Sequence, residues 1–178
     1  MKFRVIRKKS SYDYKFTPSQ PGDWDNQKRN NSQDRLQLLE DTGELVFDSP
    51  SQTVANLETL DAGVHFLDSV APGPFSIRLW VEQRDFWCWP HGIIRAKTMG
   101  SDQIDENSVT PTNISRWLVH DWQKHRSAAP QGTDTSVAWS AGCFVEPDAK
   151  LKELGQILTG RGYKSGDIID GELIEVDE

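Results

Sequence analysis

Short segments in which apolar and polar residues alternate recur along the chain, and turn residues separate them. This period of two is typical of β-strands, because successive side chains of a strand point to opposite faces of a sheet. Asp41-Thr42-Gly43 predicts the turn of a hairpin, and residues 69–74 (SVAPGP) favour a second turn. The predicted strands lie within residues 2–7, 35–50, 63–68, 74–82, 86–90 and 166–176. The pattern therefore predicts a mainly β fold.

One segment near the end has a helical period instead. Residues 147–159 predict a helix with an apolar face, Asp148 near its positive end and Gly160 as its C-terminal cap. The segment 110–126 has apolar residues at helical spacing, but residues 117–120 also fit a strand, which we favour. Residues 10–34 and 99–113 are polar and predict loops. The apolar face of the helix consists of Leu151, Leu154, Ile157 and Leu158, and Pro147 suits its first turn.

These segments predict one β-rich α+β domain over residues 1–178, with an irregular arm at 10–34. We expect a mixed or antiparallel sheet system or sandwich, with one helix in the C-terminal half packed against it. The fold class is therefore mainly β.

Charge and hydropathy exclude several kinds of partner. The net charge of −7 argues against nucleic acid, since phosphate binding needs clustered Lys and Arg. No apolar run approaches the roughly 20 residues that span a bilayer, and the first residues lack the apolar core of a secretory signal. An envelope role would therefore require another delivery route. The basic residues near the start are Lys2, Arg4, Arg7, Lys8 and Lys9, and we expect them on a solvated strand edge.

The two cysteines have different surroundings. Cys88 lies between aromatic residues in FWCWP, which predicts a buried free thiol. Cys143 follows Ser140-Ala141-Gly142, and a glycine there lets the backbone bend sharply and turn amide donors toward one point. Cys143 is thus either a packing residue or a nucleophile. A nucleophile needs a base, and His120 ends the apolar segment WLVH shortly before it. Two neighbouring strands would bring His120 and Cys143 side by side.

A strand ending in His120, a loop, and then Ser140-x-Gly142-Cys143-Phe144 resembles the catalytic stretch of the L,D-transpeptidases. The resemblance covers about residues 55–147 and is specific only in this stretch. It implies a cysteine enzyme that acts on peptidoglycan stem peptides without a cofactor. Cys143 would attack the peptide carbonyl, and His120 would take the thiol proton and return it to the leaving D-alanine. Amides near Gly142 and Cys143 would stabilise the oxyanion, and Ser140 would shape the turn.

The chain also departs from that family. Ala141 stands where a second histidine is usual, and Val145 stands where an arginine or asparagine is usual. Arg95 or Arg126 would have to replace the missing basic residue. With His91 and Trp139, these arginines complete the predicted substrate-binding set.

We considered two other classes of function, a metal site and a non-catalytic protein. A metal site is disfavoured, since His120 and His125 are five residues apart and fit neither a helical nor a strand pair of ligands. The chain has no glycine-rich phosphate loop and no dinucleotide fingerprint. A non-catalytic structural or wall-binding protein is the second alternative, because several of the seven tryptophans could stack on sugars. The distance between His120 and Cys143 distinguishes this alternative from an enzyme.

Overall fold

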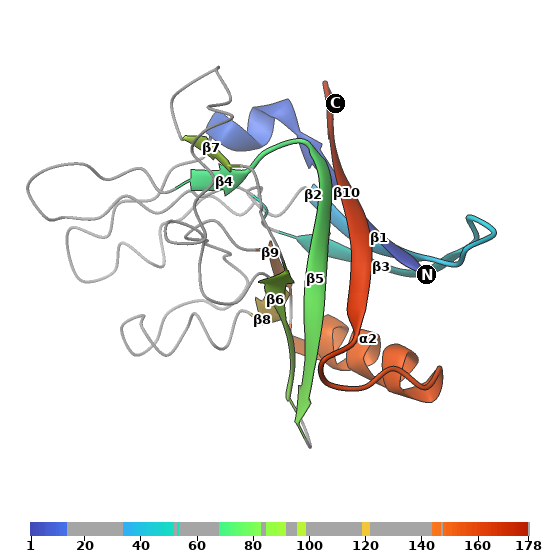
Figure 1. Cartoon of the computed structure of the whole chain (residues 1–178). Coiled ribbons are helices and arrows are strands. Elements are labelled where there is room, and N and C mark those ends of the chain that lie inside the picture. Colours follow the sequence, from blue (N-terminus) through green and yellow to red (C-terminus); the bar gives the residue numbers. More distant parts are fainter. Residues whose placement is uncertain are drawn as a thin grey trace, which may run out of the picture.

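The computed structural model describes residues 1–13, 34–51, 53, 68–82, 85–91, 96–98, 119–121, 144–146 and 148–177. Figure 1 shows the described elements in colour. The strands are β1 (Lys2–Lys8), β2 (Asp34–Leu39), β3 (Leu45–Ser51), β4 (Asp68–Val70), β5 (Gly73–Glu82), β6 (Asp85–His91), β7 (Ala96–Thr98), β8 (Val119–Asp121), β9 (Phe144–Glu146) and β10 (Ile168–Val176). The helices are the 3-10 helix η1 (Lys9–Asp13) and the α-helix α2 (Asp148–Gly160).

Eight of these strands form one mixed sheet in the order β3-β2-β1-β10-β5-β6-β8-β9, and β4 pairs with β7 in a small second sheet. The pairs β1–β10 and β8–β9 are parallel, and the other pairs are antiparallel. The sheet curls, so that its edge strands β3 and β9 lie in contact with each other. The mainly β prediction is confirmed.

The inner face of the curled sheet holds the core. Alternate residues of each strand are buried there, as Phe3 and Val5 are on β1. Helix α2 packs against β6 and β8 and adds Leu151, Leu154 and Leu158 to the same core, as its period predicts. Ile157 is only partly buried.

The predicted hairpin is confirmed as β2 and β3, with Gly43 at a φ of 90° in its turn. Strand predictions at 2–7, 74–82, 86–90 and 166–176 are also confirmed, within one or two residues at their ends. Residues 119–121 form β8, in agreement with the strand that we favoured at 117–120, whose first two residues lie outside the described ranges. Residues 63–67 and 99–113 also lie outside them.

One sequence interpretation was wrong, and two others differ from the structure at their ends. β1 is an interior strand between β2 and β10, and Arg7 is fully buried, so the basic residues do not lie on a solvated edge. The turn predicted at 69–74 shrinks, since Val70 ends β4 and Gly73 begins β5. At the ends of the arm predicted at 10–34, residues 10–13 belong to η1 and Asp34 begins β2. Residues 14–33 lie outside the described ranges, so the arm itself stays a prediction.

The cap of α2 also differs from the prediction. Gly160 ends the helix, but the left-handed residue is Gly162, with a φ of 87°. The amide of Gly162 donates to the Thr159 carbonyl at 3.0 Å, and the amide of Tyr163 donates to the Leu158 carbonyl at 3.0 Å. These two bonds make a Schellman motif, in which the residue beyond the last helical turn needs a positive φ. A second glycine two residues along therefore takes the capping role.

Candidate functional site

His120, the predicted base, belongs to β8, which pairs with β9 at the far edge of the sheet. These strands run parallel, with Val119 opposite Phe144, His120 opposite Val145 and Asp121 opposite Glu146. His120 therefore stands in register with a residue two positions after Cys143 in the sequence. The backbone of His120 is described, but its side chain is not. Outside the described residues lie Cys143, Gly142, Ser140, Arg95, Trp139 and Arg126, so their predicted roles stay predictions.

In the part of the chain that the structure describes, short strands carry this edge, and few backbone pairs attach it to the rest of the sheet. β8 and β9 have three residues each, and β8 joins β6 through the one register pair Cys88–Val119. Side chains of β9 supply further anchors. Phe144 is fully buried and packs edge-on against Phe75 of β5, with ring centroids 5.7 Å apart. Its strand is thereby tied to the core.

The other anchor of β9 is polar. Glu146 and Ser51 are both fully buried, and the Ser51 hydroxyl donates a hydrogen bond of 2.6 Å to Oε1 of Glu146. Ser51 lies at the end of β3 and Glu146 at the end of β9, so this bond joins the two edges of the curled sheet. Figure 1 shows β3 passing behind β10 and β5 toward β9.

Cys88 is not a candidate nucleophile. Its side chain is fully buried on β6, and it is a free thiol, as the aromatic surroundings predicted. Burial raises the pKa of Cys88 well above its ordinary value, and the charge of Glu146 raises it further. Because the thiolate is the reactive form, this cysteine is chemically inert in the folded protein.

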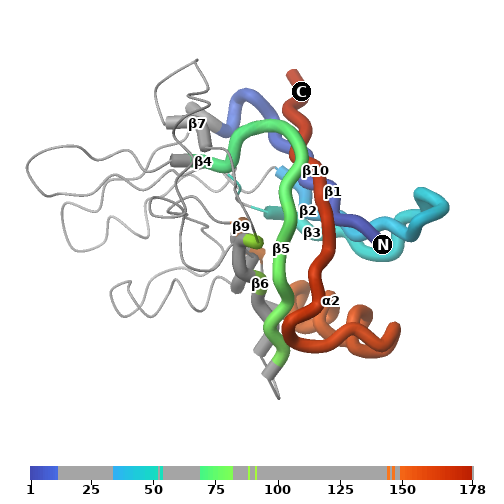
Figure 2. The backbone as a smooth tube through the Cα atoms, in the orientation of Figure 1, coloured from blue at the N-terminus to red at the C-terminus, as the bar shows by residue number. Residues whose placement is uncertain are grey.

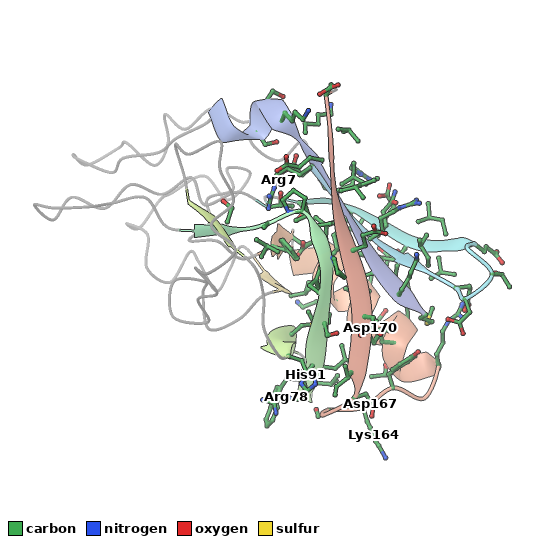
Figure 3. All side chains as sticks on the ribbon, turned by 45° about the horizontal axis from the view of Figure 1, so that its top comes forward. Arg7, Arg78, His91, Lys164, Asp167 and Asp170 are labelled. Carbon is green, nitrogen blue, oxygen red and sulfur yellow. The ribbon has the colours of Figure 1, made fainter. Side chains whose placement is uncertain are left out.

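His91, the predicted substrate-binding histidine, is exposed at the end of β6. Its register partner on β5 is Ser76, whose hydroxyl donates a 2.6 Å hydrogen bond to Asp170 of β10. Asp170 is the register partner of Ser76 on the other side. His91, Ser76 and Asp170 therefore lie in one row across three strands. The row belongs to the outer face of the sheet, since Ser76 alternates with the buried Phe75 and Ile77. Figure 3 shows His91 and Asp170 toward the end of the sheet that lies away from Arg7.

Among the described residues, a dense polar cluster surrounds Arg7, and sequence analysis missed it. Nε of Arg7 donates to the Thr53 hydroxyl at 2.9 Å, Nη2 donates to the Thr53 carbonyl at 2.7 Å, and Nη1 donates to the Val70 carbonyl at 2.6 Å. Nη1 also lies 3.5 Å from the Glu175 carboxylate. We call Arg7, Ser11, Asp34, Thr53 and Glu175 the Arg7 cluster.

Asp34 is the second centre of the Arg7 cluster. Its Oδ1 accepts hydrogen bonds from the Lys8 amide at 2.8 Å and from the Ser11 hydroxyl at 2.5 Å, and its Oδ2 accepts one from the Thr53 hydroxyl at 2.6 Å. Burial raises the pKa of Asp34, although these donors and the charge of Arg7 act in the opposite direction. The carboxyl group is therefore held by a dense set of donors inside the protein.

The Arg7 cluster holds the chain at two places, at Val70, where β4 ends, and at Thr53, two residues after the end of β3. Arg7 binds the carbonyls of Thr53 and Val70, and Asp34 binds Ser11 and Thr53. These contacts are characteristic of a structural anchor. The sequence does contain a signal for it, because Arg7 continues the inward series of Phe3 and Val5 at a spacing of two. A charged residue in that series is a candidate for a buried, partnered charge.

Two further observations concern metal ions and membranes. Within the described part of the chain, no group of three or more His, Cys, Asp or Glu side chains is placed to hold a metal ion. None of the described helices is both long enough and apolar enough to cross a membrane.

Comparison with known proteins finds a relative that matches nearly the whole chain. A protein of Treponema pallidum (strain Nichols) is 32% identical over 185 residues, a match that covers 99% of this chain and 81% of the relative. The chain belongs to the family of this Treponema protein. That relative is described only as an uncharacterized protein. No family model matches the chain, and no solved structure matches it.

Proposed function

We propose that this protein is a cysteine acyltransferase or peptidase of the L,D-transpeptidase or L,D-carboxypeptidase type, acting on peptidoglycan stem peptides. The observation that carries the proposal is the pairing of β8 with β9. The segment that ends near His120 and the segment that follows Cys143 are hydrogen-bonded neighbours, with His120 in register with Val145. A nucleophile and its base must lie within a few ångströms of each other, and adjacent strands are one way to meet that requirement.

In the proposed reaction, the Cys143 thiol gives its proton to His120 and its sulfur attacks the peptide carbonyl. Amides near Gly142 and Cys143 stabilise the oxyanion, an effect typically worth about 10²–10³ in rate per donor. The carbon–nitrogen bond then breaks, and His120 returns the proton to the leaving D-alanine amine. The resulting thioester transfers its acyl group to an amine in transpeptidation or to water in hydrolysis. Either acceptor regenerates the Cys143 thiol.

The described residues support the proposal in two further ways. Cys88, the other thiol of the chain, is buried with a raised pKa, so Cys143 is the candidate left for a nucleophile. The strand that follows Cys143 is anchored at both ends, through Phe144 and through Glu146. In the proposal, Ser140 shapes the turn, and His91, Arg95, Trp139 and Arg126 bind the stem peptide.

The test is incubation of the purified protein with muropeptides that carry tetrapeptide stems, followed by mass spectrometry of the products. We expect loss of D-alanine or formation of cross-linked dimers with the wild-type chain. Cys143→Ala and His120→Ala should abolish both products, whereas His65→Ala and His125→Ala should retain them. Unchanged substrate with the wild-type protein, or full activity in Cys143→Ala, would refute the enzyme.

A non-catalytic wall-binding role is the second candidate. Trp80 is 40% exposed on the outer face of β5, and exposed aromatic rings are suited to stacking on sugars. The departures at Ala141 and Val145 also favour this candidate over a complete active site. Binding to purified peptidoglycan sacculi without any product would support it, and weaker binding of Trp80→Ala would identify the surface.

A further inference from the structure

The hydrogen bond between Ser51 and Glu146 is unusual in its position. It links residues 95 apart in sequence, both fully buried, and they belong to strands at opposite edges of the eight-stranded sheet. The neighbours of Ser51 and Glu146 in the strand ladders are Asp34 and Asp121. No strand pair of the sheet joins β3 to β9. The side-chain bond between Ser51 and Glu146 therefore joins the described strands β3 and β9, which no backbone ladder joins.

This contact matters because, among the described residues, β9 is a short strand and the bond adds to the packing of Phe144 against Phe75. The strand has three residues, its ladder partner β8 has three, and β8 meets β6 at a single register pair. Burying a carboxyl group is costly unless hydrogen bonds satisfy it. A hydrogen bond between buried polar groups stabilises the segments that it joins, so the Ser51–Glu146 contact helps to fix the end of β9.

We propose that Glu146 is a positioning residue of the active site, acting through Ser51 to hold β9 against the opposite edge of the sheet. This inference rests on the proposed function. Cys143 is bonded directly to Phe144, the first residue of β9, so the placement of β9 limits where the thiol can lie relative to His120 on β8. Catalysis is sensitive to such placement, since a displacement of about 1 Å can cost about 10²-fold in rate.

The sharpest perturbation is Ser51→Ala, because it removes the hydrogen bond and leaves Glu146 and β9 unchanged in sequence. Ser51→Thr keeps a hydroxyl donor and serves as the conservative rescue. Ser49→Ala is the matched control. Ser49 is also fully buried on β3, two residues away on the same face, but its hydroxyl donates to the carbonyl of Pro50 at 2.9 Å and not to β9.

Two measurements are made on each variant. Hydrogen exchange, read by mass spectrometry on peptides that contain residues 144–146, reports how firmly β9 is held. Steady-state turnover of the tetrapeptide muropeptide reports kcat and KM separately. We expect faster exchange of β9 in Ser51→Ala, with a fall in kcat of about tenfold or more and little change in KM. Ser51→Thr and Ser49→Ala should resemble the wild-type protein in both measurements.

Each other outcome has a definite meaning. Unchanged β9 exchange in Ser51→Ala, or faster exchange with unchanged kcat, would overturn the positioning role. An equal loss of kcat in Ser49→Ala would show a general effect of altering β3 and would also overturn it. A wild-type chain that converts no muropeptide would overturn the proposed function and this role with it, and the exchange data would then define Ser51–Glu146 as a structural contact only.

Discussion

Replacing Gly171 by alanine would place a methyl group in space that the ring of Phe75 already occupies. Gly171 is buried in the middle of β10, opposite Phe75 of β5 and Phe3 of β1. An added Cβ would lie 2.5 Å from Cζ and 2.7 Å from Cε2 of Phe75, and 3.1 Å from Cβ of Phe3. Favourable carbon contacts are about 3.5–4.0 Å, so the ring would have to move by roughly 1 Å. Gly171 is therefore required by close packing.

The ring of Phe75 is packed inside the core, since Phe75 is 5% exposed and its ring packs against Phe144. Forcing an extra methyl group into such a core costs about 1–3 kcal/mol. The loss of glycine flexibility in the unfolded chain returns about 0.4–1 kcal/mol. We expect Gly171→Ala to lower the free energy of unfolding by about 1–2 kcal/mol, which is up to about thirtyfold in the folding equilibrium.

Urea unfolding followed by tryptophan fluorescence measures this change, with a lower midpoint at an unchanged slope as the expected result. Gly160→Ala is the matched control. Gly160 ends α2, and an added Cβ there would meet no atom within 4 Å, so the substitution should leave stability unchanged or raise it by up to about 1 kcal/mol. A Gly171→Ala protein as stable as the wild type would refute the close packing of β10 against Phe75.

Three further predictions concern buried polar groups. Arg7→Met should lower the free energy of unfolding by about 3–5 kcal/mol, measured by urea titration, because it leaves the carboxyl groups of its cluster without their cation; a loss below about 1 kcal/mol would contradict this. The raised pKa of Asp34 means that the folded state binds this proton more tightly than the unfolded chain. The tighter binding of this proton stabilises the folded state fully below pH 3.8, and this contribution to the free energy of unfolding is lost as the pH rises through the raised pKa. Asp34→Asn should lack this decline when the free energy of unfolding is measured by urea titration across that pH range. A variant whose free energy of unfolding depends on pH in the same way as that of the wild type would contradict this prediction. Cys88 should resist iodoacetamide in the folded protein and react after denaturation, as read by peptide mass spectrometry; labelling of Cys88 before Cys143 would contradict its burial.

The parts of the fold that sequence predicted are those where local pattern and tertiary environment agree. The hairpin at 35–50 has alternating strands and a glycine turn, and the helix face of Leu151, Leu154 and Leu158 is buried as its period requires. Strand order was beyond such reasoning. Nothing local in β1 indicates that its neighbours are β2 and the distant β10. The basic composition of β1 instead favoured an exposed edge, which was wrong.

The candidate site was predictable to a different degree. The Gly142-Cys143 pattern and His120 are short-range signals that sequence can supply, and the structure pairs β8, which contains His120, with β9. The contact between Ser51 and Glu146 was not predictable, since it depends on how far the sheet curls. The Arg7 cluster also depends on tertiary structure, because Ser11, Asp34 and Thr53 converge from three separate segments.

The central parallel pair of β1 and β10 has a consequence for synthesis of the chain. Figure 2 shows the two strands side by side, although one begins at residue 2 and the other ends at residue 176. At about 5–20 residues per second, β1 emerges roughly 10–30 s before its partner does. Until then β1 has β2 on one side only, and β5 lacks the strand that separates it from β1. Unpaired strand edges invite association with other chains. A nascent chain with this topology must keep two such edges soluble, alone or with a chaperone, until its last described strand leaves the ribosome.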